Sequence, residues 1–479
     1  MNLINSIKNN VEHNPQKIAL IDEKRTITFQ QLDSEIQNVS NFLFQFNEKN
    51  VITIISENSI DFIISYLATI NSGIIAHLIS PETTEINLKN QIVASDSGAI
   101  LCNPTIKENF LKLKSFSLPI ISFDEMRLKQ EIRDVQTKSN EFAYLIYTSG
   151  TTSEPKGVPI SHSMIEFTTK NIIDILGYSD NDINLVPLPL NHSFGLGCVH
   201  TSLMIGSTLI LQKNSFNLKD ILNSIKKFNI TTFAAIPATL TKLLQFDENI
   251  INEYFSKVRL IITNSTSIPE NTVKNFKIIL KNGHLATYYG LTEASRSTFM
   301  IFDEKNKREN SVGKLAPGVE IKIVNEDNDE LKIGEIWIKG QNVIKKYWNN
   351  PNADKNIVNG WLKTGDLGNF DDEKYLFLQG RNDEVINIGG EKVIPSEIED
   401  VVKELPDVEE VVAFGIEHEI FGEVIKLNIV KTKKSLLEKS DILKYCVKNL
   451  EKYKIPAKIE FVEKIPKTDY GKVKRFMLK

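Results

Sequence analysis

Short apolar runs with strand character alternate with helical patterns through the first four-fifths of the chain. Clusters of Val, Ile and Thr favour strands, whereas apolar residues at intervals of three and four favour helices. This alternation is typical of an α/β fold, in which helices cover parallel strands. The clearest strand and helix pairs are 51–55 with a helix from Ile60, 208–211 with 218–228, and 259–262 with 271–280.

The pattern of apolar and polar residues changes twice towards the C-terminus. A β-rich stretch covers about 319–378, and a small α+β pattern follows Arg381. A chain of 479 residues is also too long for one ordinary core. We therefore predict an α/β fold with a large N-terminal domain, 1–380, and a small α+β C-terminal domain, 381–479. The large domain is expected to contain several subdomains, with parallel α/β sheets and a β-rich, barrel-like part.

The most chemically distinctive segment is 147–157, which combines several hydroxyl side chains with two glycines and a lysine. It follows an apolar run, 142–147, and precedes a helix expected from Ser161, so we predict a loop between a strand and a helix. Glycine N–H groups, hydroxyls and a lysine can all donate to phosphate oxygens. The loop is not a Walker A motif, because Lys156 is followed by Gly157. A turn-rich surface loop is the alternative interpretation.

Charge, cysteine content and hydropathy narrow the functional classes. A net charge of −4 and a pI near 6.1 do not favour binding of the protein to nucleic acid. Residues 431–479 hold 15 Lys and Arg against six Asp and Glu, which fits a solvated helical face or a surface for an anionic ligand. The three cysteines show no metal-binding or disulfide pattern, and no export signal or membrane-spanning run is apparent. We expect a cytoplasmic protein without a membrane or nucleic-acid partner.

Four further motifs follow the 147–157 loop along the chain. They are an aromatic-Gly-x-Thr-Glu motif at 289–294, Thr-Gly-Asp at 364–366, a glycine-rich and charged segment at 380–399 and a lysine-containing segment at 466–475. Together with the loop, and in this order over almost the whole chain, they resemble the signature, interdomain and C-terminal lysine motifs of the adenylate-forming (ANL) superfamily of acyl-CoA synthetases, peptide-synthetase adenylation domains and luciferases.

The resemblance implies a two-step reaction. A carboxylic acid attacks the α-phosphate of ATP and releases pyrophosphate, and the acyl group then passes to a thiol, giving a thioester and AMP. Because negative charge builds on the phosphorus oxygens, fixed cations and N–H donors should dominate catalysis. The catalytic residues implied are Lys472, which bridges the carboxylate and the α-phosphate, Glu293, whose oxygens suit Mg²⁺, and Thr148.

The nucleotide contacts implied by the resemblance come from four motifs. Tyr289 stacks on adenine, and Thr292 donates to phosphate. Asp366 and Arg381 bind the ribose hydroxyls. The expected ATP- or AMP-binding residues are Thr148, Ser149, Gly150, Thr151, Thr152, Lys156, Tyr289, Gly290, Thr292, Asp366, Arg381 and Lys472.

The same resemblance implies that the small domain moves between the two steps. Asp383 falls at the hinge position of the family. Gly389 and Gly390 border a thiol channel, where the lack of side chains admits a pantetheine arm, and Lys392 lies beside it. A surface salt bridge is the alternative for Asp383 and Lys392.

The sequence departs from the family pattern at two places. Ser153 stands where the signature loop carries glycine, which matters if that position needs a positive φ. Residues 264–267 replace a glycine-rich loop that borders adenine and the acid pocket, so Ser265 and Thr266 are expected to shorten this pocket.

The acid pocket is expected around 187–195, where His192 and Phe194 gate or line it. Family members that activate amino acids place an aspartate here for the substrate ammonium, and this segment has no acid. An α-amino acid is therefore disfavoured, because a buried ammonium without a partner is costly. A fatty, aryl or short organic acid remains open. Since no carrier domain follows Lys472, we expect the acceptor in trans, either CoA or the phosphopantetheine of a free acyl carrier protein.

Two alternative functions share these motifs. A luciferase-like monooxygenase would adenylate an acid and then oxygenate it. A nucleotide-binding protein that has lost its chemistry would also retain the motifs, and Ser153 and the glycine-poor 264–267 loop motivate this possibility. An acid–thiol ligase is the leading hypothesis.

Overall fold

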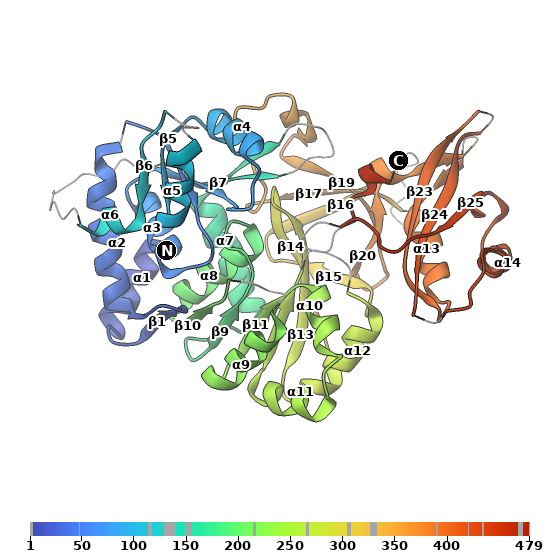
Figure 1. Cartoon of the computed structure of the whole chain (residues 1–479), viewed down its shortest axis with the longest axis horizontal. Helices are drawn as coiled ribbons and strands as arrows, with labels where there is room; N and C mark the ends of the chain where they lie inside the picture. Colours follow the sequence, from blue (N-terminus) through green and yellow to red (C-terminus); the bar gives the residue numbers. More distant parts are fainter. Residues whose placement is uncertain are drawn as a thin grey trace. The chain divides into compact units, whose positions relative to one another are not determined.

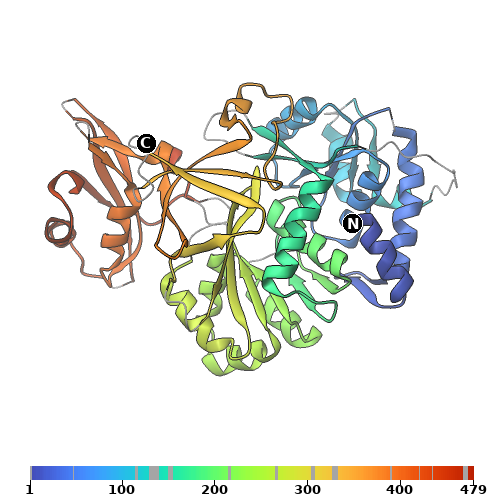
Figure 2. The same ribbon diagram turned by 180° about the vertical axis from the view of Figure 1, so that it is seen from behind.

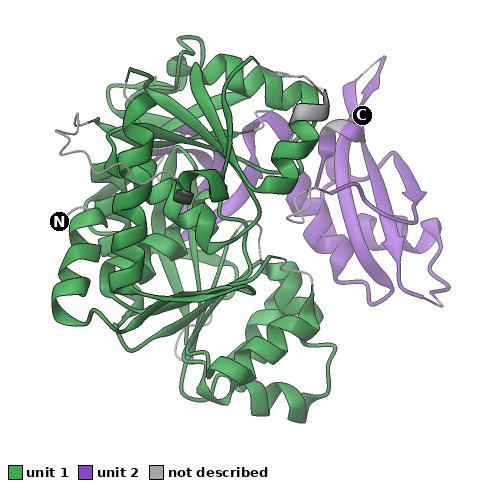
Figure 3. Cartoon of the chain, turned by 60° about the vertical axis from the view of Figure 1, so that its left-hand side comes forward, with its two compact units in different colours: residues 1–320, 338–362 green, residues 321–337, 363–479 purple. Residues whose placement is uncertain are grey.

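The structure is a computed structural model of the chain, shown from opposite sides in Figures 1 and 2. It forms two compact units, coloured separately in Figure 3: 1–320 with 338–362, and 321–337 with 363–479. The predicted boundary at 380/381 lies inside the second unit, and the mobility of 381–479 stays a prediction. The described residues are 3–46, 48–113, 117–128, 140–148, 155–213, 217–264, 268–303, 308–325, 333–388, 391–419, 421–433, 435–467 and 473–478.

The first sheet of unit 1 has the order β6-β5-β3-β4-β7-β8. All neighbouring strands are parallel except β7 and β8. Its central strands are buried along their whole length, as a sheet covered on both faces requires. Its strands are β3 (Val51–Ile55), β4 (Ile75–Ile79), β5 (Ser97–Cys102), β6 (Ile120–Ser122), β7 (Phe142–Thr148) and β8 (Lys156–Ser161).

Strand β8 corrects the sequence-based expectation for the distinctive loop. The prediction of a loop between a strand and a helix was wrong, because β8 lies between the loop and α7 and pairs antiparallel with β7. Gly157 and Pro159 are residue types that are rare in strands, so the sequence pattern does not predict β8. Proline is tolerated because β8 is the edge of the sheet, where one side of the strand needs no partner. The loop therefore joins two paired strands.

The second sheet of unit 1 follows the order β15-β14-β13-β12-β11-β9-β10-β1-β2. The six central strands of this order, from β13 through β12, β11, β9 and β10 to β1, are parallel to one another. At one end β2 is antiparallel to β1, and at the other β14 is antiparallel to both β13 and β15. These strands are β1 (Ile18–Ile21), β2 (Thr26–Thr28), β9 (Ile183–Val186), β10 (Thr208–Leu211), β11 (Thr232–Ala235), β12 (Leu260–Thr263), β13 (His284–Leu291), β14 (Ala294–Phe302) and β15 (Ser311–Leu315).

Helices pack between and around these two sheets (Figure 1). The helix α7 contacts β8 of the first sheet and β14 of the second, so it lies between them. The helices of unit 1 are α1 (Leu3–His13), α2 (Phe29–Leu43), α3 (Ile60–Asn71), α4 (Glu85–Ser95), α5 (Pro104–Leu113), α6 (Phe123–Leu128), α7 (His162–Leu176), α8 (Ser193–Ile205), α9 (Leu218–Phe228), α10 (Pro237–Leu243), α11 (Glu248–Tyr254) and α12 (Glu270–Ile279), with short 3-10 turns at 44–46, 255–257 and 353–356.

Local sequence signals fix the ends of α7. The side chain of Ser161 accepts a hydrogen bond from Met164 N over 3.1 Å, which satisfies one of the free N–H groups of the first turn. Gly177 ends the helix with a φ of 63°, a conformation that glycine adopts without strain. None of the helices in the described parts of the chain is long and apolar enough to cross a membrane.

The predicted β-rich stretch forms strands that follow one another in the order β16-β17-β19-β20, with β18 beside β19. The expected barrel-like part is an open sheet, because β16 ends the strand order and no strand in the described residues pairs with its outer edge. The strands are β16 (Val319–Val324), β17 (Gly334–Gly340), β18 (Ile357–Val358), β19 (Trp361–Phe370) and β20 (Leu376–Arg381).

The C-terminal part of unit 2 is the predicted α+β pattern, with the sheet order β22-β21-β24-β23 and β25 parallel to β24. Its apolar core joins this sheet to two helices. Its elements are η4 (Asn382–Glu384), β21 (Ile386–Ile388), β22 (Glu391–Val393), α13 (Pro395–Lys403), β23 (Val408–His418), β24 (Gly422–Lys431), α14 (Lys439–Asn449), η5 (Lys452–Lys454), β25 (Lys458–Phe461) and η6 (Arg475–Met477). The predicted α/β fold class is confirmed.

Candidate functional site

The strands β7 and β8 hold the two ends of the predicted phosphate loop. Thr148 and Lys156 are directly opposite each other in the β7–β8 register. Lys156 Nζ lies 6.0 Å from the ring centroid of Tyr347, a distance that permits a cation–π attraction. The other predicted loop residues, Ser149, Gly150, Thr151 and Thr152, and the family departure Ser153 lie outside the described residues.

Tyr347 connects this loop to the predicted metal ligand. Its hydroxyl donates a hydrogen bond to Glu293 Oε1 over 3.2 Å. Burial, and then the charge of Glu293, raise the pKa of Tyr347, so its hydroxyl stays a proton donor at neutral pH. Lys156 and Glu293, which come from separate sequence motifs, are thus brought to the same tyrosine. The sequence did not predict this role of Tyr347, because 54 residues separate it from Glu293.

Backbone pairing holds the segment around Tyr347 in place. Trp348 N donates to Gly157 O over 2.8 Å, and Ile344 N donates to Glu293 O over 3.0 Å. A Cβ at Gly157 would lie 3.0 Å from Trp348 Cβ and 3.1 Å from the ring of Tyr147, so glycine permits this close approach. The loop end and the Glu293 turn are therefore positioned by the same short segment.

The aromatic-Gly-x-Thr-Glu motif spans the end of β13 and the turn into β14. Tyr289 is 6% exposed and pairs with Thr298, so most of its ring is covered by protein in this structure. Gly290 has no room for a side chain, because a Cβ there would lie 2.5 Å from Arg296 N. Thr292 is half-buried in the turn. The predicted adenine stacking and phosphate contact stay predictions.

In unit 2, Asp366 and Arg381 lie opposite each other on β19 and β20. Arg381 Nη1 is 2.8 Å from Asp366 Oδ1 and also donates to Thr364 O over 3.0 Å. Burial tends to lower the pKa of Arg381, but the Asp366 carboxylate outweighs this effect and raises it. Gly365 has a φ of 72°, and a Cβ there would lie 2.9 Å from Arg381 Nη2. The two predicted ribose-binding residues are therefore brought together.

The predicted hinge residue follows directly. Asp383 lies in the 3-10 turn η4, and its Oδ1 accepts a hydrogen bond from Arg381 Nε over 3.2 Å. The next residue, Glu384, forms an ion pair of 2.9 Å with Arg475 Nε. Arg475 also contacts the buried Glu399 at 2.8 Å, so it ties the turn to the core of unit 2. Arg475 is the last residue of the C-terminal lysine motif, and the sequence pattern predicts no role for it.

The predicted thiol-channel and lysine residues are described only in part. Lys392 lies on β22 opposite Asn387 and is exposed. Lys467 and Val473 form an antiparallel bridge in the C-terminal lysine motif. Gly389, Gly390 and Lys472 lie outside the described residues.

The predicted acid-pocket residues lie at the start of α8. His192 is the N-terminal cap of this helix, and burial lowers its pKa to about 4, so its ring is neutral at pH 7. Phe194 is 8% exposed and packs edge-on against Tyr288, with ring centroids 5.5 Å apart. Ser265 and Thr266 lie outside the described residues.

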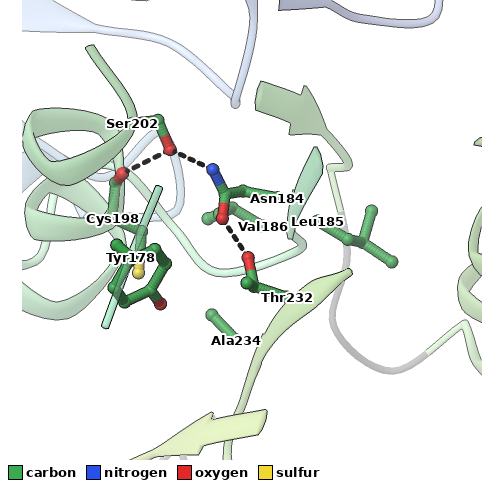
Figure 4. A pocket seen from close by; sticks show the side chains of 8 residues that line it. All are labelled: Tyr178, Asn184, Leu185, Val186, Cys198, Ser202, Thr232 and Ala234. Atoms are coloured by element: carbon green, nitrogen blue, oxygen red, sulfur yellow. Dashed lines mark hydrogen bonds between the residues drawn. The ribbon is translucent and has the colours of Figure 1, made fainter. Parts of the chain in front are cut away.

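A small cavity of about 10 Å³ lies farther along α8 (Figure 4). Polar side chains line it: Asn184 Nδ2 donates to Ser202 Oγ over 2.9 Å, and Thr232 Oγ1 donates to Asn184 Oδ1. This volume has room for about one water molecule and is too small for an organic acid. Its lining residues are Tyr178, Asn184, Leu185, Val186, Cys198, Ser202, Thr232 and Ala234.

Unit 1 offers Glu293 as a carboxylate ligand for a magnesium ion whose other ligands would come mainly from a nucleotide. No group of three His, Cys, Asp or Glu side chains in the described part of the chain could hold a metal by itself. Mg²⁺ commonly binds through one or two carboxylates together with substrate phosphates. Glu293, oriented by Tyr347, is suited to that limited role.

Comparison with known proteins now assigns the chain to a family. It matches the AMP-binding enzyme family over residues 7–348 and the AMP-binding enzyme C-terminal domain over residues 397–472. The chain belongs to the AMP-binding enzyme family. It is 30% identical to oxalate–CoA ligase of Arabidopsis thaliana, over 89% of this chain and 87% of that protein, and 29% identical to 2-succinylbenzoate–CoA ligase of Bacillus subtilis, over 97% and 95%.

The fold agrees with this assignment. The structure of o-succinylbenzoate CoA synthetase from Bacillus subtilis with its acyl-adenylate intermediate matches 99% of this chain and 98% of that one, with a TM-score of 0.88 and 28% identity. The same enzyme in complex with ATP and a magnesium ion gives a TM-score of 0.86. The resemblance to adenylate-forming enzymes is confirmed. This AMP-binding enzyme is an AMP-forming acid–thiol ligase, and the luciferase-like alternative is not favoured.

Proposed function

We propose that this AMP-binding enzyme activates a small carboxylic acid with Thr148, Lys156 and Glu293 on the phosphates of ATP, and passes the acyl group to CoA. The observation that carries the proposal is that Tyr347 donates to Glu293 and has Lys156 Nζ 6.0 Å from its ring centroid. A cation and a carboxylate from separate motifs meet at one buried side chain there. This pairing suits a nucleotide whose phosphates are shared between an ammonium group and a metal ion.

Glu293 would hold Mg²⁺ together with phosphate oxygens. The ion, when bound, neutralises charge on the leaving pyrophosphate. Tyr347 keeps the Glu293 carboxylate in one orientation, and Ile344 N fixes the backbone of the same residue. Lys156 would donate to phosphate oxygens that leave as pyrophosphate. These roles follow from the chemistry of the donors and the short segment that aligns them.

Asp366 would accept hydrogen bonds from the ribose hydroxyls. Arg381 supports this role, because it holds the carboxylate on the neighbouring strand at 2.8 Å. A carboxylate has about four lone-pair sites, so one bond to Arg381 leaves acceptor capacity for a vicinal diol. Tyr289 would contact the adenine, as the family resemblance implies.

Lys472 would supply the positive charge at the reacting centre. The acid carboxylate and the α-phosphate are both anionic, so a fixed ammonium lowers the repulsion as the new O–P bond forms and the bond to pyrophosphate breaks. After this step, rotation at Asp383 would remove Lys472 and bring Gly389, Gly390 and Lys392 towards the thiol. The position of Asp383 in a short turn next to Arg381 supports a hinge there.

CoA is the acceptor that we propose, and a free acyl carrier protein bearing phosphopantetheine is the alternative. The relatives named above are CoA ligases. The basic character of residues 431–479 suits the phosphates of CoA, since clustered cations raise the local concentration of anions. The absence of an acidic side chain in 187–195 supports an acid without an α-ammonium group.

A pyrophosphate-release screen tests the proposal. Fatty, aryl, hydroxy and amino acids are each incubated with ATP and Mg²⁺, with and without CoA, and acyl-CoA is measured in parallel. We expect release with a non-amino carboxylic acid and a thioester only when CoA is present. Glu293→Gln should raise the Mg²⁺ concentration needed for half-maximal pyrophosphate release. Glu253→Gln, which removes an exposed partner of Lys226, serves as the matched control and should not change it. The absence of pyrophosphate release with every acid tested would overturn the proposed function.

A further inference from the structure

Arg296 is a buried cation that the roles proposed so far leave unexplained. Its side chain is 5% exposed, although arginine is seldom buried without a carboxylate partner. Nη2 donates to Ser193 O over 3.0 Å, and Nη1 donates to Ser295 Oγ over 2.5 Å. Nε has no partner among the described residues. Among the described residues, two of the five N–H donors of the guanidinium therefore have an acceptor, and both acceptors are neutral.

The hydrogen-bond acceptors of this guanidinium among the described residues are uncharged. Titratable side chains on which its charge acts include Tyr144, Tyr288, Cys198 and His200. Burial raises the pKa of both tyrosines and of the cysteine to about 12, and burial lowers the pKa of His200 to about 3. All four groups are neutral at pH 7. A guanidinium stays protonated in proteins, so this buried charge is unbalanced within the described structure.

The position of Arg296 links it to the expected acid pocket. Its guanidinium lies over the ring of Tyr288, 5.0 Å from the centroid, and the same ring packs against Phe194. The carbonyl that it contacts belongs to Ser193, between the predicted pocket residues His192 and Phe194. The guanidinium therefore lies within the group of side chains that we expect to surround the acid.

The fold makes specific room for this side chain. A Cβ at Gly197, inside α8, would lie 1.8 Å from Arg296 Nη2. Glycine inside a helix is normally unfavourable, so its presence here fits the need to admit the guanidinium. Arg296 itself has a φ of 59°, a left-handed conformation that non-glycine residues rarely adopt. Such backbone strain is concentrated at functional sites.

We propose that Arg296 binds a second carboxylate on the acid, so that this enzyme activates a small dicarboxylic acid. The inference rests on the proposed function and specifies the substrate class of the same site. One carboxylate forms the mixed anhydride as the bond from the α-phosphorus to pyrophosphate breaks. The second carboxylate does not react, and it accepts hydrogen bonds from the donors of Arg296 that have no partner in the described residues. A planar guanidinium can bind a carboxylate through two parallel hydrogen bonds.

The test compares acids matched in size. Pyrophosphate release is measured with succinate, glutarate and phthalate against butyrate, valerate and benzoate. We expect the wild type to prefer a dicarboxylic acid by about tenfold or more in kcat/KM. Arg296→Met should reduce the ratio of dicarboxylate to monocarboxylate kcat/KM by about 30-fold or more, mainly through KM. Arg296→Lys should give a ratio between those of the wild type and Arg296→Met, because lysine keeps the positive charge but lacks the planar guanidinium.

Two further variants separate this role from a structural one. Gly197→Ala should displace the guanidinium without removing its charge and should lower the same ratio. Arg25→Met is the control, because Arg25 is a partly buried arginine of unit 1 that already has Glu35 and Asp61 as carboxylate partners. It should reduce stability without changing the acid preference. An unchanged ratio in both Arg296→Met and Gly197→Ala would overturn the proposal.

Binding separates failure of this inference from failure of the proposed function. If no acid releases pyrophosphate, the proposed activation reaction is wrong, and Arg296 is then judged from the rise in melting temperature with each acid alone. A rise with a dicarboxylic acid in the wild type that is lost in Arg296→Met supports the second-carboxylate site. The absence of any such difference, or an equal rise with the monocarboxylic acids, overturns it.

Discussion

The hydroxyl of Tyr347 donates to Glu293 Oε1 over 3.2 Å, although 54 residues separate them. Tyr347 is 5% exposed and also lies beside Lys156. A buried hydrogen bond to a carboxylate fixes the orientation of both groups, because the lone pair that it occupies is no longer available to water. This contact would align the two halves of the proposed phosphate site, which makes Tyr347 a positioning residue.

Tyr347→Phe should therefore weaken the use of Mg²⁺-ATP while leaving the fold intact. Loss of a hydrogen bond to a charged group is worth about 1.5 kcal/mol, which corresponds to about a tenfold change in KM for ATP. Steady-state kinetics at varied Mg²⁺ check this. Tyr445→Phe is the matched control, because its hydroxyl donates to the exposed Glu404 over 2.7 Å. Equal kinetic effects of the two substitutions would contradict a positioning role for Tyr347.

Arg381→Lys should raise KM for ATP by about tenfold, because an ammonium group cannot bond both Asp366 and Thr364 O in the fixed geometry of a guanidinium. The acid KM should change little. Arg259→Lys is the control, since Arg259 bonds Asp182 through Nε at 2.8 Å in the other unit. It should lower the melting temperature with no selective effect on ATP. An ATP effect of similar size in both variants would indicate general destabilisation.

Local sequence patterns predicted much of this fold and less of the site. The strand β10 and the helix α9 begin and end at the predicted residues, because their apolar periodicity is unbroken. The strand β8 was missed, because its proline is acceptable only at a sheet edge, and edge position is a property of the whole sheet. The register of β19 and β20 likewise places Asp366 opposite Arg381. The order of the sequence motifs indicates that both residues belong to one site, but it does not give their positions in space.

Contacts between distant segments account for most of what the sequence did not predict. Neither the bond from Tyr347 to Glu293 nor that from Arg296 to Ser193 leaves a local pattern, since each joins positions more than 50 residues apart. The conformation of Arg296 is equally hidden, because a positive φ at a non-glycine residue depends on the surrounding structure. The proposed roles of Lys472, Gly389 and Gly390 stay predictions.

Lys472→Ala should abolish acyl-adenylate formation and largely spare thioester formation from a supplied acyl-adenylate. The reason is that its charge is needed where two anions meet, and that repulsion is absent once pyrophosphate has left. Single-turnover measurements of each half-reaction test this. Lys464→Ala is the control, because it removes an exposed lysine a few residues before the motif. Equal loss of both half-reactions in Lys472→Ala would remove the assigned role.

Asp383→Pro should have the opposite effect, sparing the first half-reaction and slowing the second. Proline fixes φ and so restricts rotation at the proposed hinge. Asp383→Ala is the necessary comparison, because it removes the 3.2 Å contact with Arg381 Nε but leaves the backbone free. We expect a thioester defect only in the proline variant. If both half-reactions survive in Asp383→Pro, the hinge lies elsewhere.

Buried histidines should make the stability of unit 1 depend on pH below neutrality. Burial lowers the pKa of His200 and His77 to about 3 and that of His192 to about 4, against an ordinary value of about 6.5. The unfolded chain therefore binds more protons than the folded chain between these values. Stability is fully present above about pH 6.5 and falls as the pH decreases towards about 3, by up to about 1.4 kcal/mol per pH unit for each histidine.

Replacing one of these histidines should reduce that slope. His200→Gln keeps a side chain that can bond the hydroxyl of Tyr66, which lies 2.9 Å from His200 Nε2 in the wild type. Urea unfolding between pH 5 and 6.5 should show a slope smaller by up to about 1.4 kcal/mol per pH unit in the variant. Between pH 7.5 and 8.5 the two proteins should differ by a constant amount, because histidine is neutral there in both states. A slope in the variant equal to that of the wild type would show that His200 is not the neutral, buried group that the structure describes.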